Sequence, residues 1–396
     1  MAGNPKYLSS EAAARGITSP WVPVIICCSL ISVPYLIFSW SRYTPISKVA
    51  TVFEHVLVST IVVSIIILAS AIAVRAGKSV SGGAVSRNLL NVLWLVVFAS
   101  IIANCILVVT SGGAYIVGGF IAARASFAFD GLGAIIRTYM LALPLLLVYA
   151  KNRRLIWSIV AIIALFSIAR AVIMSERLAI IEFIATMWVA AVAGSYRISL
   201  KQVLMVTAAA IIAFGAIAVT RYDQQRDQNI RISPAQIILG SFIPYYTDTQ
   251  NKFYLSLRGD FRYPKKFTLA PIDAFASKPS STGFLAYWSV RSSAIIKWLT
   301  NPGGLTSLVS DFGVVGGAVA LAAVFGASGF IISNSRYAGP SAILAPLFVV
   351  SIVDFPRHLY IALPMSAYIV ALGILLIAFN YSGIRKRGGV GLRHPS

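Results

Sequence analysis

Residues 53–74 read FEHVLVSTIVVSIIILASAIAV, and no charged residue follows Glu54 within this stretch. A helix needs about 20 apolar residues to cross the hydrocarbon core of a bilayer, so the stretch predicts a membrane span. The same pattern recurs along the chain. Further spans are predicted at residues 21–40, 88–110, 132–150, 155–174, 178–196, 202–220, 304–332, 339–355 and 359–380.

The composition of the 396 residues agrees with this pattern. Hydrophobic residues make up 58% of the chain and charged residues 11%, and the mean hydropathy is +0.83. A soluble domain carries about a quarter charged residues, so soluble, disordered and fibrous proteins are excluded. A β-barrel is excluded because its strands give no long apolar runs. The sequence predicts an all-α polytopic membrane protein with about 10 transmembrane helices, or 12 if residues 237–256 or 283–300 also enter the membrane.

The domain organisation follows from these spans. We predict a cytoplasmic N-terminus at 1–20, seven transmembrane helices within 21–220, one large outer loop at 221–303, three helices within 304–380 and a basic cytoplasmic tail at 381–396. The large loop is polar and aromatic, which is typical of amphipathic segments that lie at the membrane surface.

The basic residues set the orientation, because cytoplasmic loops of membrane proteins are enriched in Lys and Arg. With the basic tail inside, that side holds 15 of the 33 basic residues and one of the 12 acids, Glu11. The net charge of +21 does not indicate nucleic-acid binding, because the basic residues are scattered between apolar spans rather than gathered in one patch.

The other 18 basic residues lie on the outer side or in the outer halves of spans, where this rule does not favour them. A charge inside the membrane costs about 3 kcal/mol or more and usually faces a cavity or a partner. Arg170 and Arg177 enter the same outer region from adjacent predicted helices. Each could reach the interface or pair with an acid such as Glu176 or Glu182. As a group, arginines favour an anionic, phosphorylated substrate at the outer leaflet.

Two further motifs lie on the outer side. Residues 245–254 read YYTDTQNKFY, and rings, amides and carboxylates of this kind are typical of sugar sites; an aromatic belt at the interface is the alternative. Residues 310–317 read SDFGVVGG, in which the glycines favour close helix packing and Asp311 is a candidate for chemistry. The three histidines, His55, His358 and His394, are too far apart in sequence to predict a metal site.

The order of these features over about residues 150–380 resembles the oligosaccharide repeat-unit polymerases of bacterial surface polysaccharides, the Wzy group. The matching positions are Arg177 in its Ser-Glu-Arg turn, the 245–254 cluster and the segment 311–316. The resemblance implies a GT-C-like fold in the bacterial inner membrane, with the large loop and the active site facing the periplasm. It also implies a metal-independent glycosyltransferase without a cofactor, which works among membrane lipids and in some cases with a chain-length regulator.

In such an enzyme the donor and the acceptor are undecaprenyl-pyrophosphate-linked oligosaccharides, and the product is an O-antigen or an exopolysaccharide. The residues expected to hold the pyrophosphate are Arg170, Arg177, Arg221, Arg291 and Arg357. The candidate catalytic bases are Asp248, Glu176 and Asp311, and the candidate sugar-binding residues are Tyr245, Tyr246, Asn251 and Tyr254.

Two alternatives stay open. An O-antigen ligase would share the fold, and His358 is the one candidate here for the loop histidine of the ligases. A transporter or flippase for a lipid-linked anionic glycan would need charges at mid-membrane, whereas the inner halves of the predicted spans carry almost none.

Overall fold

The computed structural model describes residues 18–40, 49–79, 83–126, 130–174, 176–194, 234–259 and 303–386, together with residues 212 and 215. Within these ranges the chain is helical and contains no strand. Six helical segments are long and apolar enough to cross a membrane; they lie in α3, α4, α5–α6, α7, α13 and α15. The structure is therefore consistent with the helical membrane protein that the composition predicts. The predicted span at 202–220 lies almost wholly outside the described residues, as do Arg221 and Arg291.

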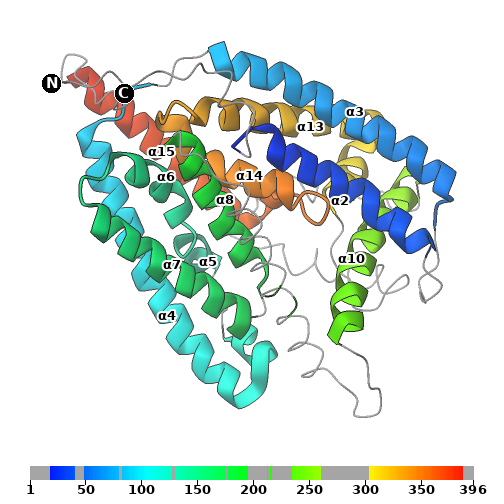
Figure 1. Ribbon diagram of the computed structural model, residues 1–396, viewed down its shortest axis with the longest axis horizontal. Coiled ribbons are helices and arrows are strands. Elements are labelled where there is room, and N and C mark those ends of the chain that lie inside the picture. Colours follow the sequence, from blue (N-terminus) through cyan, green and yellow to red (C-terminus); the bar gives the residue numbers. More distant parts are fainter. Residues whose placement is uncertain are drawn as a thin grey trace.

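The helices follow one another as shown in Figure 1. They are α2 (Trp21–Trp40), α3 (Val52–Ser79), α4 (Arg87–Ala125), α5 (Asp130–Ile135), α6 (Tyr139–Tyr149), α7 (Arg153–Ile173), α8 (Leu178–Ala193), α10 (Pro234–Leu257), α13 (Gly304–Ser335), α14 (Ala345–Val353) and α15 (Pro364–Lys386), with short 3-10 helices η1 (Pro340–Ile343) and η2 (Tyr360–Ala362). Most begin and end within a few residues of the predicted spans. The span predicted at 339–355 is not one continuous helix. It consists of the short 3-10 helix η1 followed by α14.

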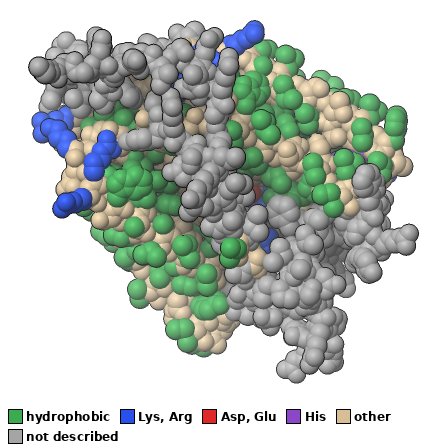
Figure 2. Space-filling view, in the orientation of Figure 1, with side chains coloured by type: hydrophobic (Ala, Val, Ile, Leu, Met, Phe, Trp, Pro, Cys, Tyr) green, Lys and Arg blue, Asp and Glu red, His purple; other side chains and the backbone are tan. Residues whose placement is uncertain are grey.

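The connections between consecutive helices gather at two ends of the bundle. At one end, hydrogen bonds join Tyr337 to the carbonyl of Lys78 (2.8 Å) and Tyr149 to the carbonyl of Ala338 (3.1 Å). Basic side chains collect here: Arg75, Lys78, Arg87, Lys151, Arg153 and Arg154 are exposed, and Arg336 is half-buried. Figure 2 shows Lys and Arg side chains grouped near the start of α4 and α7. We call this the basic end; the charge distribution predicts that it is cytoplasmic.

The opposite, distal end carries Arg170, Glu176, Arg177 and Arg357, which the sequence predicts to act outside the membrane. There α2, α4 and α7 end, and α3, α8 and α13 begin. The backbone N–H of Gly304 donates to the carbonyl of Phe355 (2.8 Å), which holds the start of α13 against the end of α14.

Helix α10 lies within the region predicted as the outer loop, but it is not a surface segment in its second half. From Tyr246 to Ser256 its side chains are buried or half-buried, and the helix packs on α2 and α13. The run is polar, and polar groups can be buried only when they find partners. Part of the predicted loop therefore belongs to the packed helical body.

The close contact between α13 and α14 gives a first test. A Cβ on Gly304 would lie 2.5 Å from the ring of Phe355 and 2.7 Å from its carbonyl oxygen, whereas a Cβ on Gly326 of the same helix would meet no atom within 4 Å. We expect Gly304→Ala to lower the free energy of unfolding by about 1–3 kcal/mol through overpacking, and Gly326→Ala to leave it unchanged or slightly higher. Thermal unfolding of the purified proteins in detergent measures both, and equal stabilities would contradict this packing.

Candidate functional site

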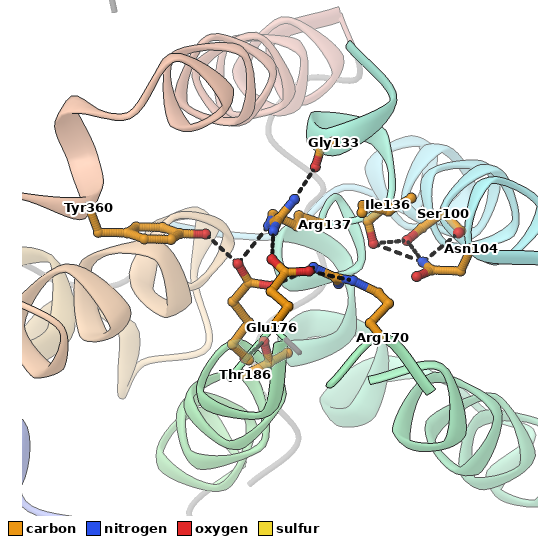
Figure 3. A network of polar contacts seen from close by, with 10 residues as sticks. Ser100, Asn104, Gly133, Ile136, Arg137, Arg170, Glu176, Thr186 and Tyr360 are labelled. Carbon is orange, nitrogen blue, oxygen red and sulfur yellow. Dashed lines mark hydrogen bonds and ion pairs between the residues drawn. The ribbon is translucent and has the colours of Figure 1, made fainter. Parts of the chain in front are cut away.

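Four charged side chains meet at the distal end in one network (Figure 3). Arg137 donates from Nε to Glu182 (2.6 Å) and from Nη2 to Glu176. Arg170 donates from Nη2 to Glu176 (2.9 Å) and lies 3.5 Å from Glu182. We call Arg137, Arg170, Glu176 and Glu182 the charged network. It holds two positive and two negative charges, so it is neutral as a whole.

Burial explains why these four residues pair. Arg137, Arg170 and Glu182 are buried, and only the side chain of Glu176 has appreciable exposure, at 20%. Removing a charge from water costs several kcal/mol unless an opposite charge and hydrogen bonds replace the solvent. The sequence left open whether an outer arginine reaches the interface or pairs with Glu176 or Glu182. For Arg170 the structure shows the pairing.

Each member of the charged network comes from a different element. Arg137 lies in the turn between α5 and α6, and the preceding carbonyl, that of Ile136, accepts hydrogen bonds from Ser100 (2.8 Å) and Asn104 (2.9 Å) on α4. Arg170 lies in the last turn of α7, Glu176 in the following loop and Glu182 in α8. The charged network therefore links helices that are distant in sequence.

The network extends to η2 through Tyr360, whose hydroxyl donates to Glu182 (2.8 Å). Arg137 also donates to the carbonyl of Gly133 (2.7 Å). The predicted site contained neither Arg137 nor Tyr360. The sequence does indicate that Arg137 is unusual, because it is an arginine within the outer half of a predicted span. It was not predicted as a site residue, because no recognisable motif surrounds it.

The turn before η2 carries a second polar group, Asp354, Arg357 and His358, which we call the His358 turn. His358 donates from Nδ1 to the buried carboxylate of Asp354 (2.8 Å), and Arg357 lies 3.9 Å from that carboxylate. Burial lowers the pKa of His358, against the opposing effect of Asp354. The imidazole is thus kept neutral with Nε2 left as an acceptor, the arrangement of a general base.

Helix α10 carries a third polar group. Lys252 Nζ lies 2.7 Å from Asp248 Oδ2 one helical turn away, and both side chains are buried. Burial raises the pKa of Asp248 to about 6, although the Lys252 ammonium lowers it. Asp248 is therefore a more basic carboxylate than a solvent-exposed aspartate.

The predicted sugar-binding residues of α10 lie between helices. Asn251 accepts a hydrogen bond from the backbone N–H of Val49 (3.2 Å), and the hydroxyl of Tyr254 bonds His55 Nδ1 (2.6 Å). Tyr246 is buried as well, and the side chain of Tyr245 lies outside the described residues. Asn251 and Tyr254 thus fix α10 against the start of α3 and the residues before it.

The His358 turn lies between the other two groups. Two residues beyond it, Tyr360 contacts the charged network. On the other side, a Cβ on Gly303 would lie 3.1 Å from both the carbonyl of Pro356 and the Cβ of Thr249 on α10. The segment 354–360 therefore contacts the charged network through Tyr360 and passes close to α10 beside Gly303.

The predicted site residues are only partly brought together. Arg170 and Glu176 are in direct contact, and half-buried Arg177 is next to Glu176 in the chain. Asp248 and Arg357 belong to the two neighbouring groups, and Asp311 is buried in the first half of α13.

Within the described part of the chain, no group of three or more His, Cys, Asp or Glu side chains could hold a metal ion. Comparison with known proteins adds no relative: no family model, no curated protein and no solved structure matches this chain.

The charged network gives a second test. Glu182→Gln removes one negative charge and leaves the buried guanidinium groups of Arg137 and Arg170 short of a counter-charge, which costs about 3–5 kcal/mol of stability. Glu54→Gln is the control, because Glu54 is 48% exposed and lies 3.6 Å from Arg258, and a glutamine can still accept the hydrogen bond that the Thr51 N–H donates to Glu54 (2.7 Å). We expect a much lower unfolding temperature for Glu182→Gln and little change for Glu54→Gln. Similar shifts in the two variants would show that the network does not stabilise the fold.

Proposed function

We propose that the chain is a metal-independent glycosyltransferase that polymerises undecaprenyl-pyrophosphate-linked oligosaccharide units at the periplasmic face of the bacterial inner membrane. The resemblance to the Wzy group motivates the reaction. The observation that carries the proposal is that Arg170, Arg177 and Arg357 lie on segments of the distal end, where Arg170 pairs with Glu176 and Arg357 lies 3.9 Å from Asp354. Guanidinium groups in apolar helical segments are costly in lipid and suit an anionic substrate.

The proposed reaction needs stabilisation of the leaving group. A hydroxyl oxygen of the acceptor sugar attacks the anomeric carbon of the donor, and the bond from that carbon to the lipid pyrophosphate breaks with its electron pair on the pyrophosphate. Fixed cations stabilise the charge that develops there. Arg177 and Arg357 are half-buried and accessible, whereas Arg170 is 1% exposed and held by Glu176. Because Arg177 and Arg357 are more exposed than Arg170, we assign first contact with the substrate to them, and expect Arg221 and Arg291 to add to them.

The hydroxyl proton of the acceptor must pass to a base. Glu176 is a poor choice, because two guanidinium groups stabilise its negative form. Asp248 has a pKa raised to about 6, which is closer to the pH at which a general base works. It is buried and paired with Lys252, so it acts as the base only if the acceptor reaches this ion pair. Asp311, buried on α13, remains the other carboxylate candidate.

A second candidate is the O-antigen ligase of the same fold, which transfers a finished glycan to lipid A core. The pairing of Asp354 with His358 favours it, because an oriented neutral imidazole could take the proton from the acceptor hydroxyl.

Arg177→Ala tests the main proposal. We expect loss of long-chain polysaccharide with single repeat units left on the carrier or core, because the leaving group loses a fixed cation. Arg177→Lys should also perform poorly, since an ammonium does not offer the planar donor fork. Arg154→Ala, at the exposed basic end, is the control. Chain-length ladders on gels, at matched protein levels in the membrane, give the readout.

A normal ladder from a well-expressed Arg177→Ala protein would contradict the assignment of Arg177. Polymerisation of lipid-linked units by the purified protein in vitro is the direct test of the activity. Complete polymer left on the carrier in a deletion strain would favour the ligase.

His358→Gln separates the two candidates further. If His358 Nε2 takes the proton, the variant should lose at least 100-fold in transfer rate, within the usual contribution of a general base. Because the pKa of His358 is lowered, wild-type activity should persist below pH 6.5 and fall only when the imidazole is protonated. A His358→Gln protein with a normal rate and pH profile would remove the histidine from the chemistry and favour a carboxylate base.

A further inference from the structure

We propose that Arg137 and Arg170 form an anion-binding site that is now occupied by the carboxylate of Glu176, and that a phosphate or diphosphate group takes the place of this carboxylate. The inference rests on the proposed function only for the natural ligand, the diphosphate of a lipid carrier. It adds Arg137 to the binding residues and makes Glu176 a displaceable occupant rather than a base.

The contacts of Glu176 resemble those of a bound anion. Its Oε1 accepts from Arg137 Nη2, and its Oε2 accepts from Arg170 Nε (3.2 Å) and Nη2 (2.9 Å). One carboxylate thus bridges two guanidinium groups. Phosphate oxygens accept the same paired donors, and they carry more charge than a carboxylate.

The exposure of the side chains shows the direction of entry. Glu176 is 20% exposed, whereas the side chains of Arg137, Arg170 and Glu182 are 5% exposed or less. Among these four side chains, that of Glu176 is therefore the one that a ligand meets first. In addition, Nη1 of Arg170 is buried and has no hydrogen-bond partner among the described residues. A phosphate group has more acceptor oxygens than a carboxylate and can satisfy this donor.

The proposed exchange is a side-chain movement. The backbone carbonyl of Glu176 accepts from the N–H of Ala179 (3.2 Å), which ties the main chain to the first turn of α8. In this proposal the carboxylate of Glu176 rotates away from both arginines while the main chain keeps its place.

The charges favour exchange for a strong anion. With Glu176 in place the charged network is neutral. When Glu176 leaves, two guanidinium groups face the single carboxylate of Glu182, which stays fixed because Tyr360 and Arg137 both donate to it. The site then has a net charge of +1, and a buried unpaired cation strongly favours binding of an anion. Glu176 thereby keeps the arginines paired while no substrate is bound.

The test measures binding of inorganic pyrophosphate to the purified full chain in detergent by titration calorimetry. We expect Glu176→Gln to bind at least 10-fold more tightly than wild type, because the competing carboxylate is gone. Glu54→Gln makes the same change in net charge at an exposed ion pair and should bind like wild type. Adding Arg137→Ala to Glu176→Gln should abolish the gain.

A Glu176→Gln protein that binds pyrophosphate no better than Glu54→Gln overturns the inference. Glu176→Asp guards against a folding defect, because it keeps the negative charge but is too short to bridge both arginines. We expect this variant also to bind pyrophosphate more tightly than wild type. Wild-type affinity would count against the exchange of Glu176 for an anion.

Comparing the affinities for farnesyl diphosphate and inorganic pyrophosphate shows whether the anion belongs to a lipid carrier or is free. Tighter binding of the prenyl compound supports a lipid carrier, and equal binding supports a free anion at the same site. Polymerisation is assayed separately, so the two proposals can fail independently. If Glu176→Gln binds pyrophosphate more tightly but the wild-type chain does not polymerise lipid-linked units, the anion site is supported and the glycosyltransferase proposal is contradicted.

Discussion

The neutralisation of two guanidinium groups away from water is the interaction on which the distal end depends. Arg137 and Arg170 are buried, so each requires a carboxylate within hydrogen-bonding distance, and Glu176 and Glu182 supply both. Because the four residues lie on separate segments, meeting this requirement brings α7, α8 and the turn before α6 together. Through Tyr360 it also fixes the start of the segment that leads into α15.

A second buried ion pair meets the same physical requirement in a local way. Asp248 and Lys252 are one turn apart on α10, so they satisfy each other without reference to any other helix. The position of α10 must then come from other contacts, and Asn251 and Tyr254 provide them. Charge pairing across the chain determines how helices meet, whereas pairing within a helix only permits the helix to be buried.

The apolar helices could be predicted from the sequence, and the contents of the site only in part. Helices α3, α7 and α13 follow from runs that are apolar by composition alone. Helix α10 falls in the region predicted as an outer loop with amphipathic segments, or as a further span at 237–256, because residues 247–252 are polar and their partners cannot be read from the local sequence. Arg137 was missed as a site residue for a related reason, since Glu176 and Glu182 lie 39 and 45 residues further along the chain. Sequence patterns report on neighbours, and this network is built from distant residues.

Gly313 divides α13 into two parts with different surroundings. Its φ of +72° departs from helical geometry and lies in the region that favours glycine. Before it, Ser310 meets Ser256 of α10; after it, Ser333 bonds the carbonyl of Val74 in α3. One continuous stretch of chain therefore contacts α10 at its beginning and α3 at its end. An alanine at this position has open space for its Cβ, so the strain it adds is that of a positive φ, and a shift of this torsion would move the two parts of α13 relative to each other.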